Sequence, residues 1–123
     1  MSSIALFKSK HFAVRIVKLN VYLRDSKKEY VMSKQLLRSG TSIGANLTEA
    51  KYAISRNDFL AKTYIALKET AETLYWLELL YNTNYLTKEQ YTSILRDAEE
   101  LLRLLTAVTK TMKNDTSTSA PSS

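Results

Sequence analysis

A row of apolar residues near the C-terminal end alternates at spacings of three and four, and this regularity constrains the fold most strongly. The row consists of Tyr91, Ile94, Ala98, Leu101, Leu105, Val108 and Met112. Such spacing places every member on one side of an α-helix. The 123 residues include only 2 Gly and 1 Pro, whereas turn-rich β architectures need more of both. The sequence therefore predicts an all-α protein.

Three other segments have the same helical spacing, and sequence signals mark where each helix begins. Capping signals occur at Ser26–Glu29, Ser55–Asp58 and Thr87–Gln90, where side chains can satisfy the first free amides of a helix. The predicted helices span residues 4–25, 28–54, 56–81 and 88–113. Short connections force successive helices to run antiparallel. We therefore expect one domain, residues 1–113, folded as an up-and-down antiparallel four-helix bundle.

Two further segments carry specific expectations. Gly40 and Gly44 lie one turn apart in the second predicted helix, where the missing side chains would let a neighbouring helix approach closely. Ile54 closes the apolar row of the same helix and is expected in the core. Residues 114–123 are rich in Ser and Thr and have no apolar period, so they are expected to form a disordered tail.

Composition argues against several kinds of site. The chain has no Cys, which excludes disulfides and thiolate chemistry and fits a cytoplasmic location. Its single His, His11, cannot supply the paired Glu-x-x-His motifs of di-iron bundles. No secretion signal and no membrane-spanning run is apparent. We expect a non-enzymatic protein without metal, cofactor or membrane contact.

Several motifs, once the helices are placed, together resemble one protein family. They are Phe12–Lys18, Ser33–Asn46, Glu49-Ala50, Asp58-Phe59, Ile65–Glu69 and Glu72–Leu77. The pattern covers about residues 7–113 and resembles the bacterial 23S rRNA-intervening-sequence proteins. The resemblance implies a four-helix bundle that assembles as a homopentamer. It also implies a relation to the accessory bundles of diversity-generating retroelements, in which a basic pentamer binds nucleic acid and reverse transcriptase. Most members have no known function.

Positive charge is concentrated in the first half of the chain. Residues 1–56 carry 11 Lys/Arg and 3 Asp/Glu, against 7 and 9 in residues 57–123. The candidate nucleic-acid-binding residues are Lys8, Arg15, Lys18, Arg24, Lys27, Lys28, Lys34, Arg38 and Arg56. A charged run is often only a solvated face, but an oligomer multiplies its attraction for phosphates. Binding to RNA or DNA is expected to be driven by the backbone and to be sensitive to salt.

Four polar residues of the family pattern are candidates for a structural network. They are Asn46, Glu49, Lys68 and Glu72. We interpret them as an interhelical hydrogen-bond network, because partly buried polar groups need partners. A catalytic carboxylate is the alternative, but no nucleophile or second acid–base group accompanies these residues.

A final stripe lies on the third predicted helix, opposite its core side. It comprises Tyr64, Ala71, Tyr75 and Leu79, with Lys68 among them. A helix that is apolar on two sides is usually covered by a partner, so the stripe is a candidate oligomer interface; scattered surface tyrosines are the alternative. A second hypothesis for the whole protein follows, namely a protein–protein scaffold that binds no nucleic acid.

Overall fold

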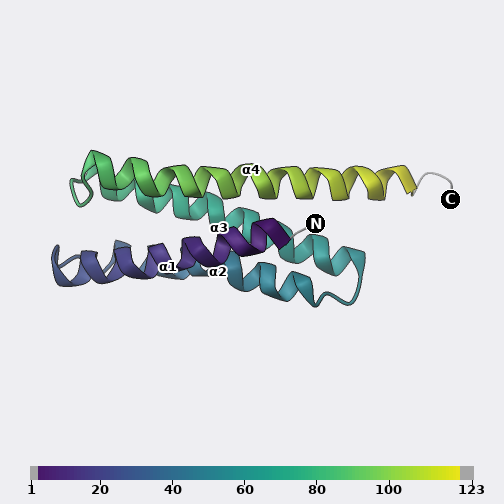
Figure 1. Ribbon diagram of the computed structural model, residues 1–123, viewed down its shortest axis with the longest axis horizontal. Helices are drawn as coiled ribbons and strands as arrows, with labels where there is room; N and C mark the ends of the chain where they lie inside the picture. Colours follow the sequence, from purple (N-terminus) through teal and green to yellow (C-terminus); the bar gives the residue numbers. More distant parts are fainter. Residues whose placement is uncertain (1–2, 120–123) are drawn as a thin grey trace.

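The computed structural model describes residues 3–119, which form the predicted up-and-down bundle (Figure 1). The helices are α1 (Ser3–Asp25), α2 (Met32–Lys51), α3 (Arg56–Asn82) and α4 (Lys88–Ser119). The α1–α2 and α3–α4 turns lie at one end of the bundle, and the α2–α3 connection lies at the other. Each helix packs along the next one in the chain, and α1 meets α4 over a shorter stretch. The all-α prediction is confirmed.

The core is built from the apolar rows that the spacing predicts. Its largest fully buried apolar side chains are Phe12, Ile16, Leu23, Leu36, Ile43, Leu47, Leu77, Leu80, Leu101 and Leu105. Ile54 was wrongly predicted as a core residue, because α2 ends at Lys51 and the Ile54 side chain is 94% exposed in the connection to α3. The apolar spacing continues in the sequence beyond Lys51, but the helix that would turn Ile54 toward the core has already ended.

The start of α2 differs from its predicted capping box. The chain turns at Lys28, whose φ is 56°, and α2 begins only at Met32. The Glu29 carboxylate accepts hydrogen bonds from the backbone amides of Val31, Met32 and Ser33 at 3.2, 3.0 and 2.7 Å. Glu29 therefore caps α2, while Ser26 belongs to the preceding turn.

The other two helix starts are as predicted. Ser55 Oγ accepts from the Asp58 amide at 3.0 Å and caps α3. At α4, the Gln90 amide donates to Thr87 Oγ1 and the Thr87 amide donates to Gln90 Oε1, at 3.1 and 2.8 Å, which is a complete capping box. These contacts satisfy amides that no helical carbonyl can reach.

Close packing at the two glycines of α2 is confirmed. A Cβ atom placed on Gly40 would lie 2.8 Å from Ile16 Cγ1, and one on Gly44 would lie 3.2 Å from Ser9 Oγ. Both neighbours belong to α1, so the glycines set how near α1 and α2 approach each other.

Helix α4 continues to Ser119 and runs beyond the α2–α3 connection (Figure 1). The helix end therefore lies at Ser119, later than the predicted residue 113, and residues 120–123 lie outside the described part. No Gly or Pro occurs between Asn114 and Ser119, so nothing in this stretch breaks the helix.

Candidate functional site

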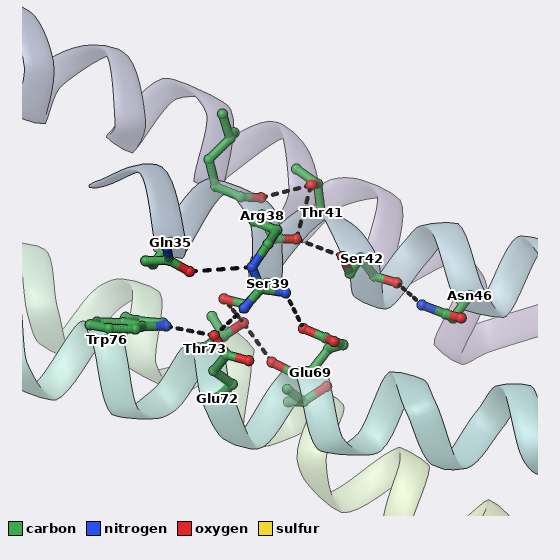
Figure 2. A network of polar contacts seen from close by, with 12 residues as sticks. Gln35, Arg38, Ser39, Thr41, Ser42, Asn46, Glu69, Glu72, Thr73 and Trp76 are labelled. Carbon is green, nitrogen blue, oxygen red and sulfur yellow. Dashed lines mark hydrogen bonds and ion pairs between the residues drawn. The ribbon is translucent and has the colours of Figure 1, made fainter. Parts of the chain in front are cut away.

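A polar cluster joins α2 to α3 on the outside of the bundle (Figure 2). Arg38 of α2 reaches over to Glu69 at 3.2 Å and to Glu72, and both carboxylates belong to α3. Gln35 Oε1 accepts from Arg38 Nε at 3.3 Å, and Trp76 Nε1 donates to Glu72 at 2.9 Å. We refer to these five residues as the Arg38 cluster.

The electrostatics of this cluster favour a structural role. The hydrogen bonds from Arg38 and then from Trp76 hold the pKa of Glu72 below its ordinary value, and the same bond to Glu72 raises the pKa of Arg38. Both groups therefore stay charged at neutral pH. A general acid or base works best with a pKa near the operating pH, so Glu72 is poorly suited to proton transfer. The cluster ties two helices together.

A buried contact lies beneath the cluster. The Thr73 hydroxyl of α3 is hydrogen-bonded to the Ser39 hydroxyl of α2 at 2.9 Å, and both residues are fully buried. Polar groups removed from water are stable only when they find partners. This pair therefore fixes how α3 lies along α2.

The four residues of the predicted network do not come together. Asn46 donates to the Ser42 carbonyl within its own helix at 2.9 Å. Glu49 accepts from Lys62 of α3 at 2.8 Å, and Lys68 is exposed without an ion pair to any described residue. Only Glu72 belongs to the Arg38 cluster. The two carboxylates do bridge α2 and α3, as an interhelical network requires, but at separate places.

Several of the candidate basic residues are engaged with neighbouring side chains. Lys8 pairs with Glu100 at 3.1 Å, and Arg15 pairs with Asp97 at 2.7 Å. Arg24 donates to the Asn20 amide oxygen at 3.4 Å, and Arg38 lies in its cluster. The two ion pairs of α1 both lead to α4, so part of the expected basic face instead holds the first helix against the last.

The remaining candidates lie near the α1–α2 turn, apart from Arg56, which is exposed in the first turn of α3. Lys18, Lys27, Lys28 and Lys34 are all exposed and form no ion pair with another described residue. The carboxylate of Glu29, which lies between them in sequence, is turned inward onto the backbone of α2. We call these four lysines the turn lysines. They leave this end of the molecule positively charged.

A second basic surface escaped the sequence analysis. Arg96, Arg103 and Lys110 follow one another at seven-residue intervals on α4 and are all exposed. That interval returns to nearly the same side of a helix, so they form one row, the α4 cationic row. The acids of α4 obscured it in the charge count. Asp97 and Glu100 turn toward α1, which leaves the cations on the outer side.

The predicted interface stripe of α3 does face outward. Tyr75 is 54% exposed, Ala71 is also exposed, and Tyr64 and Leu79 are half-buried. The Tyr75 ring packs edge-on against Trp76, with ring centroids 4.9 Å apart. A large aromatic side chain is therefore held in place on an open surface.

Within residues 3–119, no three His, Asp or Glu side chains gather as metal ligands. No helix in this part of the chain combines the length and the hydropathy that a membrane-spanning segment needs. His11 stacks obliquely on Phe7, with ring centroids 4.6 Å apart, beside a shallow hollow that Asp97 and Glu100 also line.

Comparison with known proteins identifies the family to which this bundle belongs. Residues 2–107 match the family described as 23S rRNA-intervening sequence protein. The chain belongs to this family. A crystal structure from Bacteroides thetaiotaomicron, described as a protein of unknown function from the S23 ribosomal protein family, is 56% identical. It superposes with a TM-score of 0.87, over 89% of this chain and 97% of the other. No curated protein matches. The family match and the superposition thus agree with the four-helix fold described above.

Proposed function

We propose that this member of the intervening-sequence family is a non-enzymatic, cytoplasmic bundle that binds the phosphate backbone of RNA or DNA and acts as a homo-oligomer. The observation that carries the proposal is the set of turn lysines, which are exposed and unpaired with any described acid. An ion pair already satisfies Lys8, Arg15 and Arg38. The turn lysines and the α4 cationic row are the two groups of cations that we assign to the polyanion.

Assembly would strengthen such binding. Each copy has a net charge of +6, and phosphate affinity rises steeply with the number of contacts made together. The resemblance to the basic pentamers of retroelements supports a ring of this kind. Neither surface presents a recognition helix with base-reading side chains, so the selectivity is for backbone charge and shape.

Binding is tested by fluorescence anisotropy with a labelled RNA duplex, single-stranded RNA and a DNA duplex between 50 and 400 mM salt. We expect Lys27→Glu/Lys34→Glu and Arg96→Glu/Arg103→Glu each to weaken binding at least tenfold at low salt. The wild-type affinity should fall steeply with salt, with a log–log slope of about −0.9 for every phosphate contact on a DNA duplex. Arg38 is left unchanged, because a carboxylate there would face Glu69 and Glu72.

The matched control is Lys51→Glu/Lys68→Glu, which reverses two exposed charges that form no ion pair with a described residue and lie outside both surfaces. It should keep most of the affinity. Equal affinity for wild type and both test variants would overturn the assigned surfaces. No binding by any protein at 50 mM salt would overturn the nucleic-acid function and leave the protein–protein scaffold.

A further inference from the structure

Helix α1 has a second apolar side that faces away from its own bundle. The α1 outer row consists of Ile4, Phe7, Val14, Val17 and Val21. Three of its members, Phe7, Val14 and Val21, are spaced seven residues apart, and their side chains are 61%, 54% and 47% exposed. The buried row of α1, with Phe12 and Ile16, lies on the other side. An apolar seam repeated in this way is typical of a helix that packs against another helix.

Cations border this seam. At 100° per residue, Lys10 and Lys18 lie about 40° to either side of Val14, and both are exposed. Neither forms an ion pair with a described residue. The surface is thus an apolar strip with a positive margin.

A surface lined by apolar and acidic residues lies between α3 and α4, and Arg96 and Arg103 of the α4 cationic row lie within one turn of its Glu99. A shallow groove there is lined by Ala71, Leu74, Tyr75, Tyr91 and Leu95, with Glu78 and Glu99 at its rim. Both glutamates are exposed and form no ion pair with a described residue. Burial raises the pKa of Tyr91, and the charges of Glu78 and Glu99, which line the same groove, raise it further.

We propose that the α1 outer row of one copy docks into the α3–α4 groove of the next copy, with Lys10 and Lys18 against Glu78 and Glu99. Two α1 rows placed face to face would bring four lysines together, and two grooves would bring together four carboxylates. Like charges at close range disfavour both arrangements. A contact between two different surfaces repeats head to tail and closes into a ring when its rotation permits. The inference rests on the proposed assembly and names its two surfaces. It places Lys18 in the contact between copies, so Lys27, Lys28 and Lys34 are the turn lysines that stay open to nucleic acid in the oligomer.

Complementation between two variants tests the contact. Val14→Glu disables the row and leaves the groove intact, whereas Tyr75→Glu disables the groove and leaves the row intact. We expect each variant alone to be a monomer by light scattering at micromolar concentration, where wild type is a defined oligomer. Mixed in equal amounts, the two should form a dimer, because one undamaged row can still meet one undamaged groove.

The dimer also shows that both variants are folded, and circular dichroism checks each one separately. Ile54→Glu, at a side chain 94% exposed outside both surfaces, should leave the wild-type oligomer unchanged. A wild-type monomer, a wild-type-sized oligomer for either variant, or a mixture that stays monomeric would overturn the inference. Nucleic-acid binding is read separately by anisotropy, so its failure is distinguishable from failure of this contact.

Discussion

Glu29 and Glu72 both have a carboxylate, but the carboxylates have different hydrogen-bond donors and therefore different structural roles. Three backbone amides bind the Glu29 carboxylate, whereas Arg38 and Trp76 bind that of Glu72. Both glutamates were predicted from the sequence to form hydrogen bonds, but the groups that donate to them were not. Ser26 and Glu29 have capping-box spacing, yet the positive φ of Lys28 delays the helix. Arg38 lies 34 residues before Glu72, so their contact depends on how two helices are aligned, which local spacing does not encode.

The Glu72 ion pair predicts a pH dependence of stability. An unfolded glutamate has a pKa of about 4.3, and the folded value is lower. The carboxylate therefore stabilises the fold above that pH, and this contribution is lost as the pH falls through the lowered pKa. Since Arg38 is 47% exposed, we expect Glu72→Gln to destabilise the protein at pH 7 by no more than about 1 kcal/mol. The difference from wild type should shrink below about pH 4.

Urea unfolding at pH 7, 5, 4 and 3 measures this difference. Asp25→Asn is the control, because Asp25 is exposed, forms no ion pair with a described residue and lies outside the proposed contact between copies; its free energy of unfolding should stay parallel to that of wild type. A Glu72→Gln protein with the same pH profile as wild type would contradict the assignment.

At the scale of helices, the close packing of a neighbouring helix on α2 was predictable from the Gly40–Gly44 spacing. For α1, only part of its surface was predicted. Its basic residues were recognised as candidates for binding. Its outer row was not, because Phe7, Val14 and Val21 are seven residues apart and polar residues separate them. The α4 cationic row was missed for a similar reason. A charge sum over residues 57–123 adds the charges of α3 to those on every side of α4, and only the folded bundle separates them.

Gly40→Ala should destabilise the bundle although alanine favours helices. A new Cβ would meet Ile16 at 2.8 and 2.9 Å, and overpacking a core typically costs about 1–3 kcal/mol. That outweighs a gain in helix propensity of about 1 kcal/mol. Gly44→Ala is the comparison. Its nearest neighbour is the Ser9 hydroxyl at 3.2 Å, so the change should be smaller. Thermal and urea unfolding measure both, and a Gly40→Ala protein more stable than wild type would contradict the packing argument.

For the whole molecule, closure of the bundle depends on polar contacts between its first and last helices. Lys8 with Glu100 and Arg15 with Asp97 join α1 to α4, where the two helices share a shorter stretch than the other neighbouring pairs. The sequence predicted the fold but assigned Lys8 and Arg15 to a partner outside the molecule. Their acids lie more than 80 residues away in the chain, and only the closed bundle brings them close.

A double-mutant cycle of Arg15→Ala and Asp97→Ala measures this closure. Both side chains are about 40% exposed, so we expect a coupling of about 0.5–1 kcal/mol. It should decrease in 1 M salt, where screening is strong. Lys18→Ala combined with Asp97→Ala should show no coupling. A coupling indistinguishable from zero for the Arg15 cycle would mean that the ion pair does not help to close the bundle.

The two apolar sides of α1 have a consequence for changes in its length. One residue inserted after Val17 would turn the rest of the helix by about 100° relative to its first half. If Phe7 stayed outside and Phe12 inside, Leu23 would leave the core and Val21 would leave the exterior row. No rotation of the helix could restore both halves. Lineages should therefore tolerate added residues in the Tyr52–Ser55 connection far more readily than anywhere between Phe7 and Leu23.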